Sequence, residues 1–179
     1  MALVARPSPT AKRYIMRIVP RLSLTLVLDS VRSAYNVGAV FRTADCAHIE
    51  QVLTCGHTPP AEHPRVRKTA LDAELVVRTK HHPTLRTALA ELQLAGMQIY
   101  AVELTEEAQS IWNMPDDTFH APTALVFGNE VAGVNLEVTR EFGISELSLP
   151  QYGVKDSLNV AAAASIVMYH WRYRATQTG

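Results

Sequence analysis

Residues 24–45 read LTLVLDSVRSAYNVGAVFRTAD, and the hydrophobic period changes within this stretch. Residues 24–28 are a short apolar run that ends at Asp29, which predicts a buried strand. After Asn36 the apolar residues recur at i, i+3, i+4 and i+7, which predicts a helix with Asn36 as its N-cap. A buried strand followed directly by a helix is the basic unit of an α/β fold.

The rest of the chain continues this alternation. Strands are predicted at residues 51–54, 75–77, 99–102, 124–127 and 147–149. Helices are predicted at residues 83–95 with Gly96 as the stop, in a polar stretch near Glu106, and from about Ser157 to Arg174. We therefore expect one α/β domain over residues 1–179, with a mostly parallel sheet and helices on both of its faces.

Charge and composition exclude several classes of protein. The chain has 17 basic and 17 acidic residues, so it is not a strongly basic nucleic-acid-binding domain, although a local basic patch remains possible. No apolar run approaches the roughly 20 residues of a membrane-spanning helix, and the N-terminus does not resemble a secretory signal. Residues 1–21 contain five basic residues and no acidic one, which is typical either of an arm that contacts a polyanion or of an organelle-targeting segment. We expect a cytoplasmic protein.

Cysteine and histidine residues do not indicate a disulfide framework or a metal site. Cys46 and Cys55 do not form a C-x-x-C pair, and we interpret them as small apolar residues in a reducing compartment. The nearest group of histidines (His57, His63, His81 and His82) fits no zinc-binding spacing, so we expect no metal.

Three segments rich in glycine and asparagine follow predicted strands, at residues 36–45, 127–133 and 149–160. Open α/β sheets bind ligands at the carboxyl ends of their strands, so these segments are the candidate site. Gly128 and Gly133 have the glycine spacing of a P-loop, but Val134 and Asn135 stand where Lys and Ser or Thr are required. No G-x-G-x-x-G motif follows a strand, which argues against a dinucleotide-binding reductase.

Taken in order, the three segments read N-x-G-A-x-x-R-T-A-D, F-G-N-E-x-x-G and L-P-x-x-G-x-x-x-S-L-N-V. This series resembles the three signature motifs of the SpoU-type (TrmH-like) RNA 2′-O-ribose methyltransferases of the SPOUT superfamily. The resemblance extends from about Leu24 to Arg172. It implies a C-terminal trefoil knot, a homodimer, S-adenosylmethionine as methyl donor and a ribose 2′-OH of tRNA or rRNA as acceptor.

Two positions depart from the family pattern. His48 stands at a helix end where the family usually has Gly, and Val131 replaces a small residue in the loop beside the cofactor. These departures leave one alternative open, a catalytically inactive knotted RNA-binding protein. The residues with chemical roles in the motifs are all present, so we expect an active enzyme.

The resemblance assigns roles to residues that also have ordinary structural interpretations. It makes Arg42 the leading catalytic residue, although Arg42 could instead form a surface ion pair with Asp45. It places Ser157 and Asn159 beside the reacting ribose, although Ser157 could simply cap the last helix. It gives Asn36 a part in ordering the site through Glu130. The cofactor contacts implied by the resemblance are Leu104, Gly128, Gly133, Leu149, Gly153 and Leu158.

RNA contacts are expected from local basic residues. The candidates are Arg13, Arg17, Arg65, Arg67, Lys68 and Lys155. Only about 20 residues precede the first predicted strand, so we expect the catalytic domain to recognise RNA with its own dimeric surface.

Overall fold

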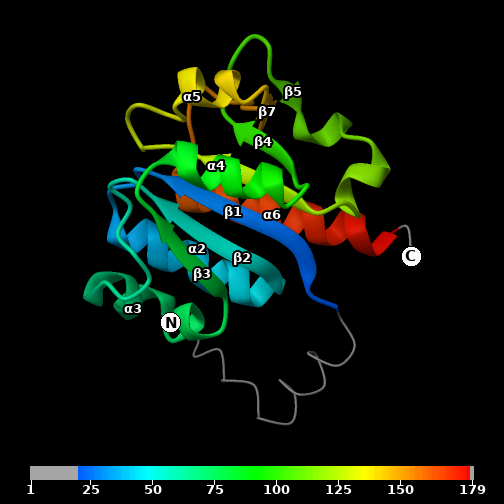
Figure 1. Ribbon diagram of the computed structural model, residues 1–179. Coiled ribbons are helices and arrows are strands. Elements are labelled where there is room, and N and C mark those ends of the chain that lie inside the picture. Colours follow the sequence, from blue (N-terminus) through cyan, green and yellow to red (C-terminus); the bar gives the residue numbers. More distant parts are fainter. Residues whose placement is uncertain (1–19, 178–179) are drawn as a thin grey trace.

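The computed structural model describes residues 20–177 and contains a sheet of seven strands whose neighbours all pair in parallel. The order across the sheet is β3-β2-β1-β6-β4-β7-β5 (Figure 1). The strands are β1 (Leu22–Asp29), β2 (Ile49–Cys55), β3 (Arg78–His82), β4 (Gln98–Val102), β5 (Gln109–Ser110), β6 (Thr123–Phe127) and β7 (Ser145–Ser148). The predicted α/β class, with a parallel sheet, is confirmed.

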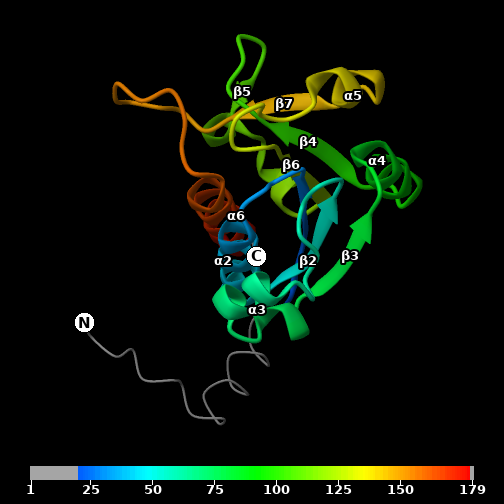
Figure 2. The ribbon, with the colours of Figure 1, turned by 90° about the vertical axis from the view of Figure 1, so that its left-hand side faces the viewer.

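Helices cover both faces of the sheet (Figure 2). Helices α2 (Ala34–Ala47), α3 (Pro64–Ala70) and α6 (Val160–Gln177) lie on one face, and α4 (Leu85–Leu94) and α5 (Leu136–Glu141) lie on the other. Short 3₁₀ turns occur at Ala73–Leu75, Ile111–Asn113 and Asp116–Phe119.

Strand β1 is buried on both faces because it lies in the middle of the sheet. Leu24, Leu26 and Leu28 join the core beneath α2 and α6, whereas Val27 joins the core beneath α4. The alternation of side chains along a strand explains this division. It also explains why the run at residues 24–28 is continuously apolar, since a covered parallel strand needs apolar side chains on both sides.

The first helix begins earlier than predicted. Ser33, and not Asn36, is the N-cap of α2, because the Ser33 hydroxyl accepts a hydrogen bond from the backbone N–H of Asn36 at 3.3 Å. Asn36 therefore lies inside the first turn, where its side chain is free for other contacts. The helix ends at His48, which has a left-handed conformation with φ of 53°. Glycine adopts this conformation most easily, which explains why the SpoU-type pattern usually has Gly at the position of His48.

Three further predictions about local structure are wrong. Residues 75–77 do not form a strand, because the edge strand β3 begins at Arg78 and uses mostly exposed polar residues on its free side. The stretch near Glu106 is a loop and not a helix. Helix α6 begins at Val160, and Asn159 takes the capping role considered for Ser157, since its Oδ1 accepts the N–H of Ala161 at 2.9 Å.

Helix α3 was not predicted, because the His- and Pro-rich segment before it resembles a loop. Pro64 stands in its first turn, where a proline costs no hydrogen bond, and the His63 side chain caps it by accepting from the N–H of Arg65. The exposed basic residues Arg65, Arg67 and Lys68 all lie on this helix.

Gly38 allows α2 and α3 to pack in close contact. A Cβ atom at Gly38 would lie 2.6 Å from the carbonyl oxygen of Val66 and 2.7 Å from Cβ of Thr69. We predict that Gly38→Ala lowers the free energy of unfolding by about 1–3 kcal/mol through overpacking, as measured by urea denaturation. Gly153→Ala is the matched control, because an added Cβ there meets nothing within 4 Å. Equal stability of the two variants would contradict the packing argument.

Candidate functional site

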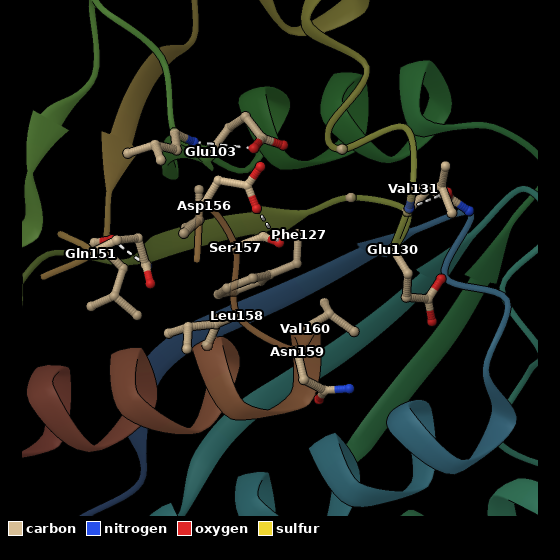
Figure 3. Close-up of a pocket in the computed structure, with 17 residues that line it drawn as sticks. Glu103, Phe127, Glu130, Val131, Gln151, Asp156, Ser157, Leu158, Asn159 and Val160 are labelled. Carbon is tan, nitrogen blue, oxygen red and sulfur yellow. Dashed lines mark hydrogen bonds between the residues drawn. The ribbon is translucent and has the colours of Figure 1, made fainter. Parts of the chain in front are cut away.

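A pocket of about 530 Å³ lies at the carboxyl ends of β4, β6 and β7. Its walls are the segment after β4, the loop after β6, and the segment between β7 and α6 (Figure 3). Eight of the predicted site residues line it, namely Leu104, Gly128, Glu130, Gly133, Leu149, Ser157, Leu158 and Asn159. The second and third sequence motifs therefore meet in one cavity.

Glu130 connects the pocket to the first motif. Its two carboxylate oxygens accept hydrogen bonds from the backbone N–H groups of Arg32 at 3.0 Å and Ser33 at 3.1 Å. The Asn36 side chain donates a third hydrogen bond to Glu130 at 3.0 Å. Asn159 in turn donates to Oδ1 of Asn36 at 3.1 Å. One network thus joins the start of α2, the loop after β6 and the start of α6.

These contacts lower the pKa of Glu130. Burial alone would raise the pKa of this carboxyl group, but hydrogen bonds from the backbone of Arg32 and Ser33 and from the Asn36 side chain outweigh it. The position of the carboxylate at the start of α2 favours the ionised form as well, since a helix N-terminus attracts negative charge. Glu130 is therefore an ionised acceptor at neutral pH and is not suited to act there as a proton donor.

The loop after β6 is tightly folded. Asn129 and Gly133 pair through their backbones, and the Asn129 side chain accepts hydrogen bonds from the N–H groups of Val131 and Ala132. A Cβ atom at Gly128 would lie 2.1 Å from backbone atoms of Gly133, so this closure requires a glycine. Val131 is 90% exposed and has no positive φ, so this departure from the family pattern fits the loop without backbone strain.

Comparison with known proteins supports the interpretation of the three motifs. The model of the SpoU rRNA Methylase family matches residues 23–169, which include all three. The chain belongs to the SpoU rRNA Methylase family.

Relatives in this family are named as RNA methyltransferases. The chain is 26% identical over 174 residues to the tRNA (guanosine(18)-2′-O)-methyltransferase of Escherichia coli (strain K12). This alignment covers 96% of this chain and 73% of that protein. It is 32% identical over 151 residues to the 23S rRNA (guanosine(2553)-2′-O)-methyltransferase RlmP of Bacillus subtilis (strain 168), covering 82% and 57%.

A solved structure of this family has the same fold. It is the AdoMet-bound rRNA methyltransferase of Sinorhizobium meliloti, with a TM-score of 0.75 and 27% sequence identity. The alignment covers 88% of this chain and 59% of that one. The chain therefore spans less than two thirds of the B. subtilis and S. meliloti proteins.

Some residues predicted from the SpoU motifs lie outside the pocket. Arg42 is exposed on α2 and makes no ion pair with Asp45 or with any other residue in the described range 20–177. Gly153 and Lys155 lie in the exposed part of the third motif and do not line the pocket. Arg13 and Arg17 fall outside the described residues. The pocket alone therefore does not include the predicted catalytic arginine.

The pocket lining also includes three residues that were not predicted from the motifs, Glu103, Gln151 and Asp156. Glu103 directly follows β4, so the rule that ligands bind at the carboxyl ends of parallel strands could have found it. Gln151 and Asp156 lie inside the third motif, at positions where its pattern leaves the residue open.

Residues 20–177 contain neither a cluster of metal-ligating side chains nor a membrane-spanning helix. No group of three or more His, Cys, Asp or Glu side chains is placed to hold a metal ion within residues 20–177. Over that range no helix is both long enough and apolar enough to cross a bilayer.

The lowered pKa of Glu130 leads to a prediction about pH. Because the folded-state pKa lies below the usual value of 4.5, ionised Glu130 stabilises the fold above that pH and this contribution is lost as the pH falls. We expect Glu130→Gln to destabilise the protein most near neutral pH, with the difference from wild type shrinking below about pH 4.5. Urea denaturation across this pH range measures the difference. Glu106→Gln, in an exposed loop, is the control, and a pH-independent effect at Glu130 would refute the argument.

Proposed function

We propose that the protein transfers a methyl group from S-adenosylmethionine to a ribose 2′-OH of tRNA or rRNA. The observation that carries this proposal is the pocket itself. Its walls include the second and third SpoU motifs, and Glu130 and Asn159 connect it to the first. The relatives named as 2′-O-methyltransferases for tRNA and rRNA support the same reaction.

The pocket fits the proposed cofactor in size and chemistry. Its volume of about 530 Å³ lies in the range of small-molecule sites. Leu104, Leu149 and Leu158 supply apolar contact, and the loops that hold them, with Gly128 and Gly133, supply backbone groups for a nucleoside. When bound, S-adenosylmethionine supplies an electrophilic methyl carbon on a positively charged sulfur. In the proposed transfer the ribose oxygen would bond to the methyl carbon, the bond between that carbon and sulfur would break to leave S-adenosylhomocysteine, and the hydroxyl proton would pass to solvent.

Arg42 acts through its charge and not as a base. A guanidinium remains protonated at neutral pH, so it cannot accept the ribose proton. A bidentate contact with the neighbouring RNA phosphate would hold the nucleotide in place and stabilise the developing negative oxygen. Ser157 and Asn159 lie at the pocket and orient the ribose. Asn36 fixes the positions of Asn159 and Glu130, because it accepts a hydrogen bond from the first and donates one to the second.

RNA binding is proposed for local basic surfaces. Arg65, Arg67 and Lys68 are exposed together on α3, and Lys155 is exposed in the segment before α6. Arg13 and Arg17, in the basic arm at residues 1–21, are proposed to extend this surface. Lysine and arginine contacts to phosphate give binding that weakens strongly with salt. Because the chain has zero net charge, this binding would depend on these local residues and not on bulk charge.

A homodimer is proposed from an apolar stripe on α6. Ile166, Tyr169 and Tyr173 recur at helical spacing and are 41%, 51% and 60% exposed. An exposed stripe of this kind on a helix that already packs against the core favours association. Dimerisation would also bring a second copy of Arg42 and the basic residues to the assembly.

The chain path supports a knot near the C-terminus. Strand β6 lies between β1 and β4, β7 lies beyond β4, and the chain then returns to pack α6 against α2. We propose that on this return the chain passes through a loop formed by the preceding segments, as a trefoil knot requires, which is an exception to ordinary topology. We further propose that residues 1–179 form one methyltransferase domain that works in the cytoplasm.

The catalytic role of Arg42 gives a direct test. We expect Arg42→Ala to lower methyl transfer from labelled S-adenosylmethionine to total tRNA or rRNA by about 10²–10³-fold, because a charged contact made in the transition state is lost. Cofactor affinity, measured by calorimetry, should not change. Arg86→Ala on α4, on the opposite face of the sheet, is the control. Undiminished transfer in Arg42→Ala would remove this residue from the mechanism, and RNA binding without transfer in the wild type would favour the inactive alternative.

The dimer is tested at the stripe on α6. We expect Ile166→Asp to convert the dimer to a monomer, because a carboxylate in an apolar interface leaves an unpaired buried charge. Light scattering coupled to gel filtration measures the molar mass. Leu94→Asp is the matched control, since Leu94 is 91% exposed at the end of α4. A monomeric wild type, or an Ile166→Asp variant that remains dimeric, would contradict this interface.

A further inference from the structure

Glu103 is a pocket residue that the motifs do not include. It directly follows β4, is half-buried, and lines the cavity (Figure 3). Its Oε2 accepts a hydrogen bond from the N–H of Val134 at 2.8 Å, and its Oε1 accepts one from the N–H of Leu104 at 3.1 Å. Two backbone amides thus fix the position of this carboxylate in the pocket wall.

The loop after β6 packs directly on this carboxylate. Gly133 has φ of 71°, and a Cβ atom at this position would lie 2.4 Å from Oε2 of Glu103. The close approach lets the next amide, that of Val134, reach the same oxygen. Glu103 therefore joins two walls of the pocket, the segment after β4 and the loop after β6.

The pocket has an unbalanced charge. Its lining includes three carboxylates, those of Glu103, Glu130 and Asp156, and no Lys, Arg or His from the described part of the chain. Glu130 already accepts hydrogen bonds from backbone N–H groups at the start of α2, and Asp156 lies in an exposed segment. Glu103 is the carboxylate that is fixed in the wall itself. A carboxylate has about four acceptor positions, so both of its oxygens can still accept from a ligand.

We propose that Glu103 is a positioning and charge-selecting residue of the cofactor pocket, which favours the cationic methyl donor over its neutral product. This inference rests on the proposed function. S-adenosylmethionine carries a positive sulfonium, whereas S-adenosylhomocysteine lacks both the transferred methyl group and that charge. A fixed negative charge in a partly buried wall stabilises the first and not the second, so loss of the charge on reaction promotes release of the product.

The charge is tested with Glu103→Gln, which keeps an oxygen acceptor for the N–H of Val134 but removes the negative charge. Titration calorimetry gives the affinities of the wild type and the variant for S-adenosylmethionine and S-adenosylhomocysteine. We expect the affinity for the donor to fall by about three- to tenfold, while the affinity for the product changes by less than about twofold. The cationic amine analogue sinefungin should follow the donor. Glu106→Gln, in the same connecting segment but outside the pocket, is the control.

The positioning role is tested with Glu103→Ala, which removes both the charge and the acceptor. We expect weaker binding of both ligands and faster hydrogen exchange at the Val134 amide, whereas Glu103→Gln keeps that amide protected. Thermal unfolding of each variant verifies that it is folded.

The outcomes separate this inference from the proposed function. A wild type that binds neither ligand would overturn the proposed function. A wild type that binds both, with a donor-to-product preference that Glu103→Gln leaves unchanged, would overturn charge selection alone. Equal losses for both ligands in Glu103→Gln would overturn it too, as would sinefungin that follows the product.

Discussion

The hydrogen bonds accepted by Glu130 are the contacts on which the candidate site depends. The carboxylate accepts from backbone amides at the start of α2 and from the Asn36 side chain, which in turn accepts from Asn159. These residues are separated by as many as 123 positions in the chain. An ionised carboxylate accepting several amides gives strong, directional contacts. The site therefore keeps its shape in part through polar contacts among the loops that follow the strands.

The parallel sheet makes this arrangement possible. Since neighbouring strands run in the same direction, the segments that follow β1, β4, β6 and β7 all leave from the same edge. The central strands β1 and β6 support the carboxyl ends of the strands, because their apolar side chains are packed on both faces of the sheet. Close approaches at Gly128 and Gly133 then bring the loop after β6 against Glu103 and close the pocket. The strands and the closely packed loops together place apolar side chains and carboxylates within one small cavity.

The errors of the sequence analysis have physical causes. Leu75 and Val76 form an apolar pair, yet they are 71% and 49% exposed, and of residues 75–77 Val77 alone packs in the core before the edge strand begins. An edge strand with one free side needs no continuous apolar run, so β3 gives little signal. Ser33 and Asn36 are both good capping residues. In the structure Ser33 caps α2 by accepting the N–H of Asn36, and the Asn36 side chain donates to Glu130 instead.

The sequence by itself determined the α/β class, the central strands and the three motifs, because periodicity and glycine spacing are local properties of the chain. It also identified the family, since the order of the motifs is preserved along the sequence. Only the tertiary structure decided which residues meet. It brought Glu103 and Asp156 to the pocket, placed Asn159 against Asn36, and left Arg42 exposed on α2. Contacts between distant segments depend on how strands and loops pack in space, and no local pattern of residues encodes them.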